Sequence, residues 1–314
     1  MTTRYDLVVE NGTNDKDTRR KEKDDDDTQD RAREQWLAAR LELLKAEKEL
    51  TIEVAHPHVV PHVEWLAARN EFLTKEKEFT RLRDELSRQR RALPWEKVEK
   101  RYEFDSTRGR ITLAELFDGR SQLIVYHFMF GPGWQEGCRS CSYVADHFGG
   151  SILHLANRDT TLAVVSRAPL AEIEAFKKRM GWKFQWVSSY ASDFNFDYHV
   201  SFTPEEISGG KVYYNYAMDD PREEGPGFSV FAKDSAGEVF HTYSTYGRGV
   251  DILIGAYNFL DLVPKGRDED GLGFTMSWVR HHDRYTQGYF VEPAQKREEP
   301  KISAGCCCSG ESHS

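Results

Sequence analysis

The fold is decided by residues 122–141, which read QLIVYHFMFGPGWQEGCRSC. The first nine residues form a nearly continuous apolar run, which is typical of a β-strand buried on both faces of a parallel or mixed sheet. The GPG sequence at 131–133 then ends the strand in a loop. Cys138 and Cys141 follow at the expected start of a helix. The sequence therefore predicts a strand, a loop and a helix that together carry two thiols.

Strand and helix patterns alternate on both sides of this stretch. Strand patterns occur at residues 101–104, 161–166, 228–232 and 238–243. Helix patterns occur at residues 112–115, which fit a capping box, at 142–148, and at 169–180, which Gly181 closes. The last two strand patterns predict an antiparallel hairpin, because only a short polar segment separates them. The alternation predicts an α/β fold with a mixed sheet flanked by helices.

The composition of the chain limits the classes of function. Its 314 residues are 39% hydrophobic, which is enough to bury one substantial core beside additional polar segments. A formal net charge of -9 argues against a general nucleic-acid surface, because such a surface needs a basic face. No stretch approaches the roughly eighteen apolar residues of a membrane span, and residues 1–10 lack a signal-peptide pattern. We therefore expect no nucleic-acid partner, no membrane partner and no secretion.

The chain contains five cysteines in two clusters. They are Cys138, Cys141, Cys306, Cys307 and Cys308. An odd number in two clusters does not suit the disulfide framework of a small secreted protein. A reducing compartment fits better, so we expect a cytoplasmic location. The sequence indicates no nucleotide site, and no cofactor is expected.

Four segments are expected along the chain. They are a disordered acidic tail at residues 1–30, a duplicated helical segment at 31–92, the main domain at 93–291 and a flexible cysteine-containing tail at 292–314. Within the acidic tail, residues 12–30 are almost entirely polar and cannot bury enough apolar surface to offset their ordering entropy. The duplication is visible in the sequence WLAAR, which occurs at 36–40 and again at 65–69.

The second copy of the repeat carries one apolar stripe. Trp65, Phe72, Phe79 and Leu86 recur every seven residues, which places them on one face of a long charged helix. Such a stripe has to pack against another surface. One interpretation is that it covers a flank of the main domain. The other is a coiled-coil contact with a partner chain, which would be helix-mediated self-association.

The spacing of Cys138 and Cys141 suits thiol–disulfide chemistry. The amides and macrodipole at a helix N-terminus stabilise a thiolate, so Cys138 is expected to be the nucleophile. Two intervening residues bring the sulfur of Cys141 within disulfide range, one turn deeper, where it would resolve a mixed disulfide. Arg139 adds a nearby positive charge. Trp134 and Glu136 flank the pair and are candidates for its supporting pocket.

Two alternatives remain open for the pair. It could form half of a zinc site, but no second C-x-x-C or close histidine pair follows, so no metal site is predicted. Both cysteines could instead be small buried side chains of the core. Elsewhere, RHHD at 280–283 is interpreted as the polar face of a last helix. His127 is interpreted as a core residue of the buried strand rather than a proton shuttle.

Four motifs resemble those of a known family. They are YHFMFGPGW at 126–134, GCRSCS at 137–142, SRAP at 166–169 and SDFNF at 192–196. Over residues 65–285 the chain resembles the uncharacterised thioredoxin-like family called domain of unknown function eight-nine-nine. The resemblance implies a thioredoxin-like core that is distantly similar to peroxiredoxins and alkyl hydroperoxide reductase subunits. It supplies no substrate, and the first repeat copy is an N-terminal helical extension to the family pattern.

The resemblance bears on individual residues. Many relatives have proline after the first cysteine, where this chain has Arg139. Peroxiredoxins carry a threonine shortly before the peroxidatic cysteine, whereas residues 134–137 read WQEG, so direct peroxide reduction ranks below disulfide exchange. Thioredoxin-like sites also place a cis-proline against the cysteine pair. Pro226, in the GPG sequence at 225–227, is the candidate for that position.

We therefore expect a thiol–disulfide oxidoreductase that uses Cys138 and Cys141 to exchange with protein or small-molecule thiols and disulfides. The alternatives are a non-catalytic thioredoxin-fold binding or regulatory module and a peroxiredoxin-like peroxide reductase. Cys306, Cys307 and Cys308 are candidates for a relay that passes electrons to the disulfide of the pair. Soft-metal capture, reversible acylation and no role at all are the other interpretations of this cluster.

Overall fold

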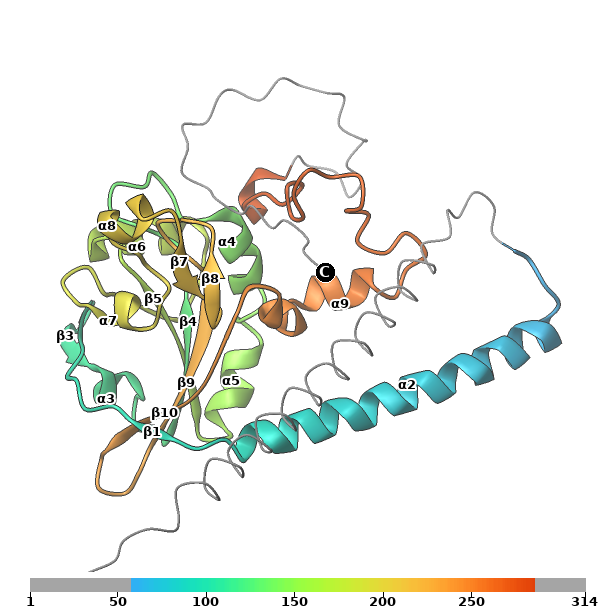
Figure 1. The fold of residues 1–314 in the computed structure, drawn as a ribbon, viewed down its shortest axis with the longest axis horizontal. Helices are drawn as coiled ribbons and strands as arrows, with labels where there is room; N and C mark the ends of the chain where they lie inside the picture. Colours follow the sequence, from blue (N-terminus) through green and yellow to red (C-terminus); the bar gives the residue numbers. More distant parts are fainter. Residues whose placement is uncertain (1–57, 286–314) are drawn as a thin grey trace, which may run out of the picture. The chain divides into compact units, whose positions relative to one another are not determined.

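The computed structural model of the chain describes residues 58–285 (Figure 1). Its strands are β1 (Glu96–Lys97), β2 (Glu103–Ser106), β3 (Gly109–Thr112), β4 (Gln122–His127), β5 (Thr160–Ser166), β6 (Gln185–Ser188), β7 (Val212–Tyr214), β8 (Ala217–Asp219), β9 (Gly227–Lys233) and β10 (Val239–Tyr246). Its helices are α2 (His62–Arg91), α3 (Leu113–Leu116), α4 (Arg139–Ala145), α5 (Ser151–Ala156), α6 (Leu170–Arg179), α7 (Phe194–Asp197), α8 (Pro204–Ser208) and α9 (Gly255–Leu260), with 3₁₀ segments η1 (Gly247–Leu253) and η2 (His282–Arg284). The acidic tail, the first repeat copy and the three C-terminal cysteines lie outside the described residues.

Eight of these strands form one mixed sheet in the order β1-β10-β9-β4-β5-β6-β2-β3. Strands β4, β5 and β6 run parallel, β9 is antiparallel to β4, and β10 is antiparallel to β9. At the centre, Tyr126 of β4 lies opposite Val164 of β5 and Phe228 of β9. A β-α-β-α-β unit followed by a β-β-α unit on the same sheet is the thioredoxin-like arrangement, so the expected fold class is confirmed.

Strand β4 is buried on both faces, as its apolar composition predicts. Leu123 and Val125 belong to a core with residues of α3 and α7, whereas Tyr126 belongs to a second core with residues of α4, α5, α6 and α9. Figure 1 shows α4 and α5 on one side of the sheet and α3 and α7 on the other. Burying one such side chain contributes roughly 1.5–3 kcal/mol to folding, so this strand anchors the domain.

Local sequence signals set several element boundaries. The predicted capping box is confirmed, because the Thr112 hydroxyl accepts a hydrogen bond from the Glu115 amide while the Glu115 carboxylate accepts one from the Thr112 amide. The predicted helix at 169–180 is α6, and Gly181 follows it with a φ of +66°, which suits glycine. The predicted hairpin is β9 and β10, with Phe231 paired to His241.

The predicted central strand is three residues too long. Strand β4 ends at His127, and the backbone hydrogen bonds to β5 stop gradually over the next residue. The amide of Phe128 still donates to the Val165 carbonyl, at 3.0 Å. The carbonyl of Phe128 accepts from a side chain, the Ser166 hydroxyl, at 2.7 Å. The apolar run continues to Phe130 because residues 128–130 are buried in the core as a loop.

The long helix α2 exposes its apolar stripe. Trp65, Phe72, Phe79 and Leu86 are each at least half exposed. The chain divides into two compact units within this helix, between Lys77 and Glu78. None of the helices in the described part combines the length and apolar composition needed to cross a bilayer.

Candidate functional site

One edge of the sheet gathers the loops that carry the predicted site. Strands β4, β5 and β6 all end there, and the antiparallel strand β9 begins there. The loops at this edge are residues 128–138, 167–169, 189–193 and 220–226. Because the carboxyl ends of parallel strands are where α/β sheets usually bind ligands, this edge is the expected place for chemistry.

Cys138 occupies the N-cap position of α4, as the sequence predicts. Its amide donates to the Met129 carbonyl at 3.0 Å. Its carbonyl accepts from both the amide and the hydroxyl of Ser142, each at 2.9 Å. Cys141 lies one turn further along the helix, and no disulfide joins the two residues. The backbone of Cys138 is therefore held from both sides at the start of a helix.

Both cysteines are buried among aromatic side chains. Cys138 is 5% exposed and Cys141 is 2% exposed, within the core that contains Tyr126. The Tyr126 hydroxyl donates to the Cys141 carbonyl at 3.5 Å. Burial raises the pKa of Tyr126 well above its ordinary value, and the neighbouring Cys141 and Cys138 raise it further. Tyr126 therefore stays protonated beside the pair and keeps its hydrogen bond to the Cys141 carbonyl.

Tyr214 contacts Pro226 and lies near Cys141. The Tyr214 hydroxyl donates to the Pro226 carbonyl at 2.6 Å. Burial raises the pKa of Tyr214, and Cys141 is one of the groups near enough to raise it further. No cis peptide bond occurs between residues 58 and 285, so Pro226 is trans and differs from the cis-proline that the resemblance suggested.

The other residues predicted to support the cysteine pair differ in their contacts and exposure. Trp134 is partly buried and donates from its indole nitrogen to Glu223 at 3.4 Å. Arg139 is partly exposed at the first position of α4. Glu136 pairs with Arg284 at 2.6 Å and with Arg179 at 2.7 Å. Trp134, Glu136 and Arg139 thus differ in their partners and in their positions along the chain that leads into α4.

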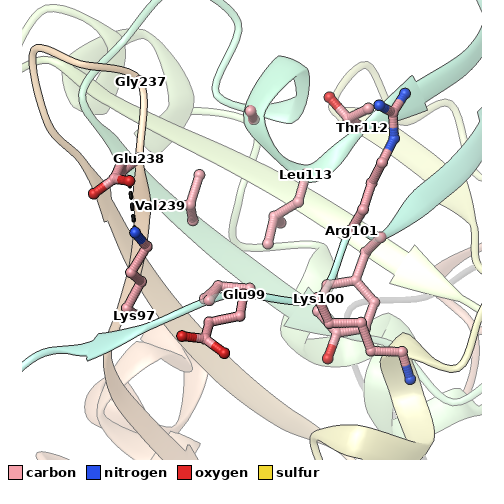
Figure 2. Close-up of a pocket in the computed structure, with 12 residues that line it drawn as sticks. Lys97, Glu99, Lys100, Arg101, Thr112, Leu113, Gly237, Glu238 and Val239 are labelled. Carbon is pink, nitrogen blue, oxygen red and sulfur yellow. Dashed lines mark hydrogen bonds and ion pairs between the residues drawn. The ribbon is translucent and has the colours of Figure 1, made fainter.

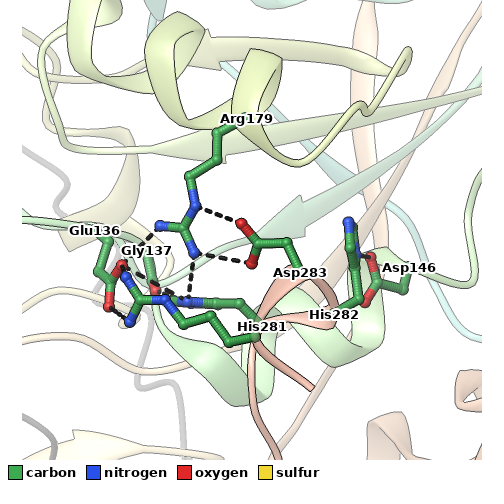
Figure 3. Close-up of polar contacts among 8 residues, drawn as sticks. Glu136, Gly137, Asp146, Arg179, His281, His282 and Asp283 are labelled. Carbon is green, nitrogen blue, oxygen red and sulfur yellow. Dashed lines mark hydrogen bonds and ion pairs between the residues drawn. The ribbon is translucent and has the colours of Figure 1, made fainter. Parts of the chain in front are cut away.

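A C-terminal segment, residues 279–284, is tied to the loop before Cys138 and is called the strap below (Figure 3). His281 is only 4% exposed, and its Nε2 lies 2.9 Å from the Gly137 carbonyl oxygen. Its Nδ1 lies 3.2 Å from a guanidinium nitrogen of Arg179. Because arginine can only donate, Nδ1 accepts and Nε2 donates, which defines a neutral imidazole. Burial lowers the pKa of His281, which favours the same neutral form.

Charged pairs fasten the part of the strap that follows His281. Arg179 of α6 binds Asp283 at 2.8 and 3.0 Å and Glu136 at 2.7 Å. The hydrogen bond from Arg179 lowers the pKa of Asp283 to about 2. His282 binds Asp146, the C-cap of α4, at 2.7 Å. The strap therefore holds the loop before the helix and also the end of the helix.

The sequence interpretation of residues 280–283 as the polar face of a last helix is wrong. Only His282–Arg284 forms a short 3₁₀ segment, and His281 is buried rather than exposed. The contact between His281 and Gly137 spans 144 positions. No local pattern in the sequence could indicate it.

A second polar cluster at this edge was not anticipated from the sequence. Glu224 is 3% exposed and accepts hydrogen bonds from Ser201 at 2.6 Å and from Arg167 at 3.1 Å. Arg167 also lies over the ring of Phe196, at 4.4 Å from its centroid. Burial raises the pKa of Glu224 to about 7. A Cβ atom added at Gly131 would lie 3.4 Å from the Glu224 carboxylate, so this carboxyl group faces the loop that precedes the cysteines.

His127 is directed away from the cysteines. Its ring stacks near Phe194 and Tyr198 in the core on the opposite face of the sheet. Its Nε2 lies 2.8 Å from the Ser229 hydroxyl. Burial lowers the pKa of His127 to about 3, so it stays neutral. His127 is a core residue, as the sequence interpretation has it.

A surface pocket of about 540 Å³ lies elsewhere, between the chain entering β2 and the turn before β10 (Figure 2). Lys97 and Glu238 form an ion pair of 2.6 Å at its rim. Its lining includes Val239, Leu113 and Tyr102, but neither cysteine. Within the described residues, no group of three or more His, Cys, Asp and Glu side chains is arranged to hold a metal.

The fold and the site together define a thioredoxin-like protein with a C-x-x-C pair at the start of the helix that follows the central strand. Residues 54–285 match the family described as "Bacterial protein of unknown function (DUF899)", and the chain belongs to this family. No curated protein matches the sequence.

Three solved structures illustrate the distant similarity. Peroxiredoxin Q of Xanthomonas campestris is 12% identical, with a TM-score of 0.34, and the match covers 53% of this chain and 96% of that one. Peroxidoxin BcpB of Mycobacterium tuberculosis is 12% identical, with a TM-score of 0.35, covering 52% and 94%. A putative thiol:disulfide interchange protein DsbE of Chlorobium tepidum is 11% identical, with a TM-score of 0.33, covering 52% and 97%.

Proposed function

We propose that this protein is a thiol–disulfide oxidoreductase that works through Cys138 and Cys141. The observation that carries the proposal is the placement of Cys138 at the N-cap of α4 with Cys141 one turn later. Amides in the first turn of a helix have no partner within the helix, so they can donate to a thiolate at this position. A separation of two residues allows the two sulfurs to form a disulfide.

The reaction transfers two electrons to a substrate disulfide. The Cys138 thiolate attacks one sulfur of the substrate disulfide. The substrate S–S bond breaks, Cys138 forms a mixed disulfide with the attacked sulfur, and the other substrate sulfur leaves as the first thiolate. Cys141 loses its proton and attacks the Cys138 sulfur, which releases the second substrate thiolate and forms the Cys138–Cys141 disulfide. A dithiol reductant must then restore both thiols.

Groups around the pair support this chemistry. The Tyr126 hydroxyl stays protonated, and its hydrogen bond to the Cys141 carbonyl holds the backbone of the expected resolving residue. Glu224 lies at the same edge of the sheet, and its raised pKa, about 7, allows it to exchange a proton near neutral pH. Both groups are buried, so their interactions are less screened by water.

Burial of the thiols favours the second candidate, a non-catalytic binding or regulatory module. Buried cysteines in apolar surroundings are ordinarily inert, and Cys138 is only 5% exposed. For catalysis the loop at 131–137 has to open when a substrate binds. The two candidates therefore differ in whether Cys138 reacts in the folded protein.

Alkylation of the reduced, folded protein tests the proposal. We expect iodoacetamide to modify Cys138 at least tenfold faster than Cys141 at pH 7, because only Cys138 lies at the N-cap of α4. The Cys138→Ser variant is expected to lose disulfide-reductase activity on insulin, and Cys141→Ser to accumulate mixed disulfides. Equally slow labelling of Cys138 and Cys141, together with no disulfide-reductase activity in the wild type, would favour the binding module. Peroxide consumption by the wild type, measured in parallel, tests the peroxide-reductase alternative.

A further inference from the structure

Arg167, the first residue after β5, is held rigidly at the edge of the sheet that carries the cysteine pair. Its Nη1 donates to the Glu224 carboxylate at 3.1 Å. Its guanidinium carbon lies 4.4 Å from the centre of the Phe196 ring. The ring contact on one face and the ion pair at one nitrogen together fix the plane of the guanidinium group. The group is therefore preorganised to bind a ligand.

One side of this guanidinium group stays open. Glu224 engages Nη1, and within residues 58–285 the Nε and Nη2 groups of Arg167 have no hydrogen-bond partner. The side chain of Arg167 is 21% exposed, so these donors can be reached from solvent. The Nε–H and Nη2–H groups form a planar fork that matches the two oxygen atoms of a carboxylate. The open side therefore suits a carboxylate ligand.

Two consecutive loop residues connect Arg167 with the cysteine pair. The Met129 carbonyl accepts a hydrogen bond from the Cys138 amide at 3.0 Å. The next carbonyl, that of Phe130, accepts from the Ala168 amide at 2.7 Å. Ala168 directly follows Arg167 in the sequence. Two backbone hydrogen bonds and two peptide links therefore bridge the backbones of Arg167 and Cys138.

A side-chain contact supports the same placement. A Cβ atom added at Gly131 would lie 3.4 Å from the Glu224 carboxylate and 3.1 Å from the indole nitrogen of Trp134. Trp134 belongs to the loop that enters α4 at Cys138. The carboxylate that holds Arg167 thus lies against the same loop.

We propose that Arg167 selects substrate disulfides that carry a carboxylate close to their sulfur atoms. This inference rests on the proposed function. The substrate carboxylate accepts two charge-assisted hydrogen bonds from Nε and Nη2 of Arg167 while the substrate disulfide meets Cys138. Cys138 is only 5% exposed, so a low-molecular-weight disulfide needs the smallest opening of the loop. Arg167 is thus a specificity-determining residue for small acidic disulfides.

A matched pair of small disulfides tests the selectivity. Dithiodipropionate carries a carboxylate at each end, and hydroxyethyl disulfide has neutral ends. The reduced protein is mixed with an excess of either probe, and formation of the Cys138–Cys141 disulfide is followed by quenched alkylation and mass spectrometry. Each rate is divided by the rate at which the same probe oxidises dithiothreitol, which corrects for intrinsic reactivity. We expect the wild type to prefer dithiodipropionate by about tenfold or more.

Three variants assign this preference to Arg167. Arg167→Lys keeps the charge and can still pair with Glu224, but lysine has no planar fork, so most of the preference should be lost. Arg167→Gln combined with Glu224→Gln removes both partners of the buried ion pair, leaves neither charge unpaired, and should abolish the preference. Arg222→Gln is the matched control, because Arg222 lies in the 220–226 loop of the same edge and pairs with Asp219. It should retain the preference of the wild type.

The concentration dependence separates binding from chemistry. With dithiodipropionate, the wild type should saturate at a lower concentration than Arg167→Lys, while the limiting rates agree within about twofold, because only substrate binding is changed. A preference retained in full by Arg167→Lys would overturn recognition through the fork. Equal preferences in the wild type and both Arg167 variants would overturn the selectivity and leave the proposed function standing. Failure of both probes to oxidise the pair would overturn both proposals.

Discussion

The imidazole of His281 donates a hydrogen bond of 2.9 Å to the carbonyl oxygen of Gly137, the residue that precedes Cys138. The same ring accepts from Arg179 through its other nitrogen, at 3.2 Å. A residue far along the sequence thereby sets the orientation of the peptide group next to the expected nucleophile. The strap is therefore expected to control how readily the cysteine loop opens.

Replacement of His281 by alanine is expected to destabilise the domain and to expose Cys138. The change leaves the Gly137 carbonyl without its buried donor, and an unsatisfied buried group costs roughly 1–3 kcal/mol. We expect a lower midpoint of urea unfolding and a severalfold faster reaction of Cys138 with iodoacetamide in the folded state. The two quantities are measured by fluorescence-detected unfolding and by mass spectrometry.

His282 offers the matched control. It is the next residue in the strap, it is more exposed, and it binds Asp146 rather than the cysteine loop. His282→Ala is expected to leave the reactivity of Cys138 within about twofold of wild type. If both variants changed Cys138 equally, the effect would belong to the strap as a whole and not to the bond with Gly137. His281→Gln, which keeps a donor, should recover part of the wild-type protection.

The raised pKa of Glu224 predicts that the stability of the folded protein depends on pH. Burial raises its pKa in the folded protein to about 7, from an ordinary value of 4.5. The folded state therefore binds the proton more tightly than the unfolded state. The stabilisation by this group is fully present below pH 4.5 and is lost as the pH rises through 7. The maximum effect is on the order of 3 kcal/mol.

The Glu224→Gln variant is expected to remove this loss, because glutamine stays neutral at every pH. The free energy of unfolding of the variant, relative to wild type, should therefore rise between pH 4.5 and pH 8 in urea titrations. Glu223→Gln changes the neighbouring exposed carboxylate and serves as control, with no such trend. A flat difference for Glu224→Gln across this range would contradict a raised pKa at this position.

Local patterns in the sequence predict the framework of the domain but not the contacts around its site. The apolar run of β4, the capping box at Thr112 and the placement of Cys138 at a helix start each depend on neighbours in sequence. The partners of Glu224 and His281 depend on segments that only the folded chain brings together. Burial of both ionisable groups is a property of that packing, and composition does not encode it.

Gly137 is expected to tolerate no side chain. A Cβ atom at this position would lie 2.6 Å from the ring of Phe128 and 2.9 Å from the ring of Phe176, which is closer than packed atoms approach. Gly137→Ala should therefore destabilise the domain by about 1–3 kcal/mol through overpacking. Gly271→Ala is the control, because nothing lies within 4 Å of the added atom there. Equal melting temperatures for the two variants would contradict the packing around Gly137.

The stripe on α2 predicts self-association through this helix. Trp65, Phe72, Phe79 and Leu86 are each at least half exposed, and a second copy of the chain presents the same stripe at the same spacing. Pairing two such faces removes apolar surface from water at about 25 cal/mol per Å². Phe72→Glu is expected to weaken any concentration-dependent association, seen by analytical ultracentrifugation as a shift towards the monomer. Asn70→Glu adds the same charge on the opposite side of the helix and should leave the association unchanged. Wild-type protein that sediments as a monomer at all concentrations would refute this role for the stripe.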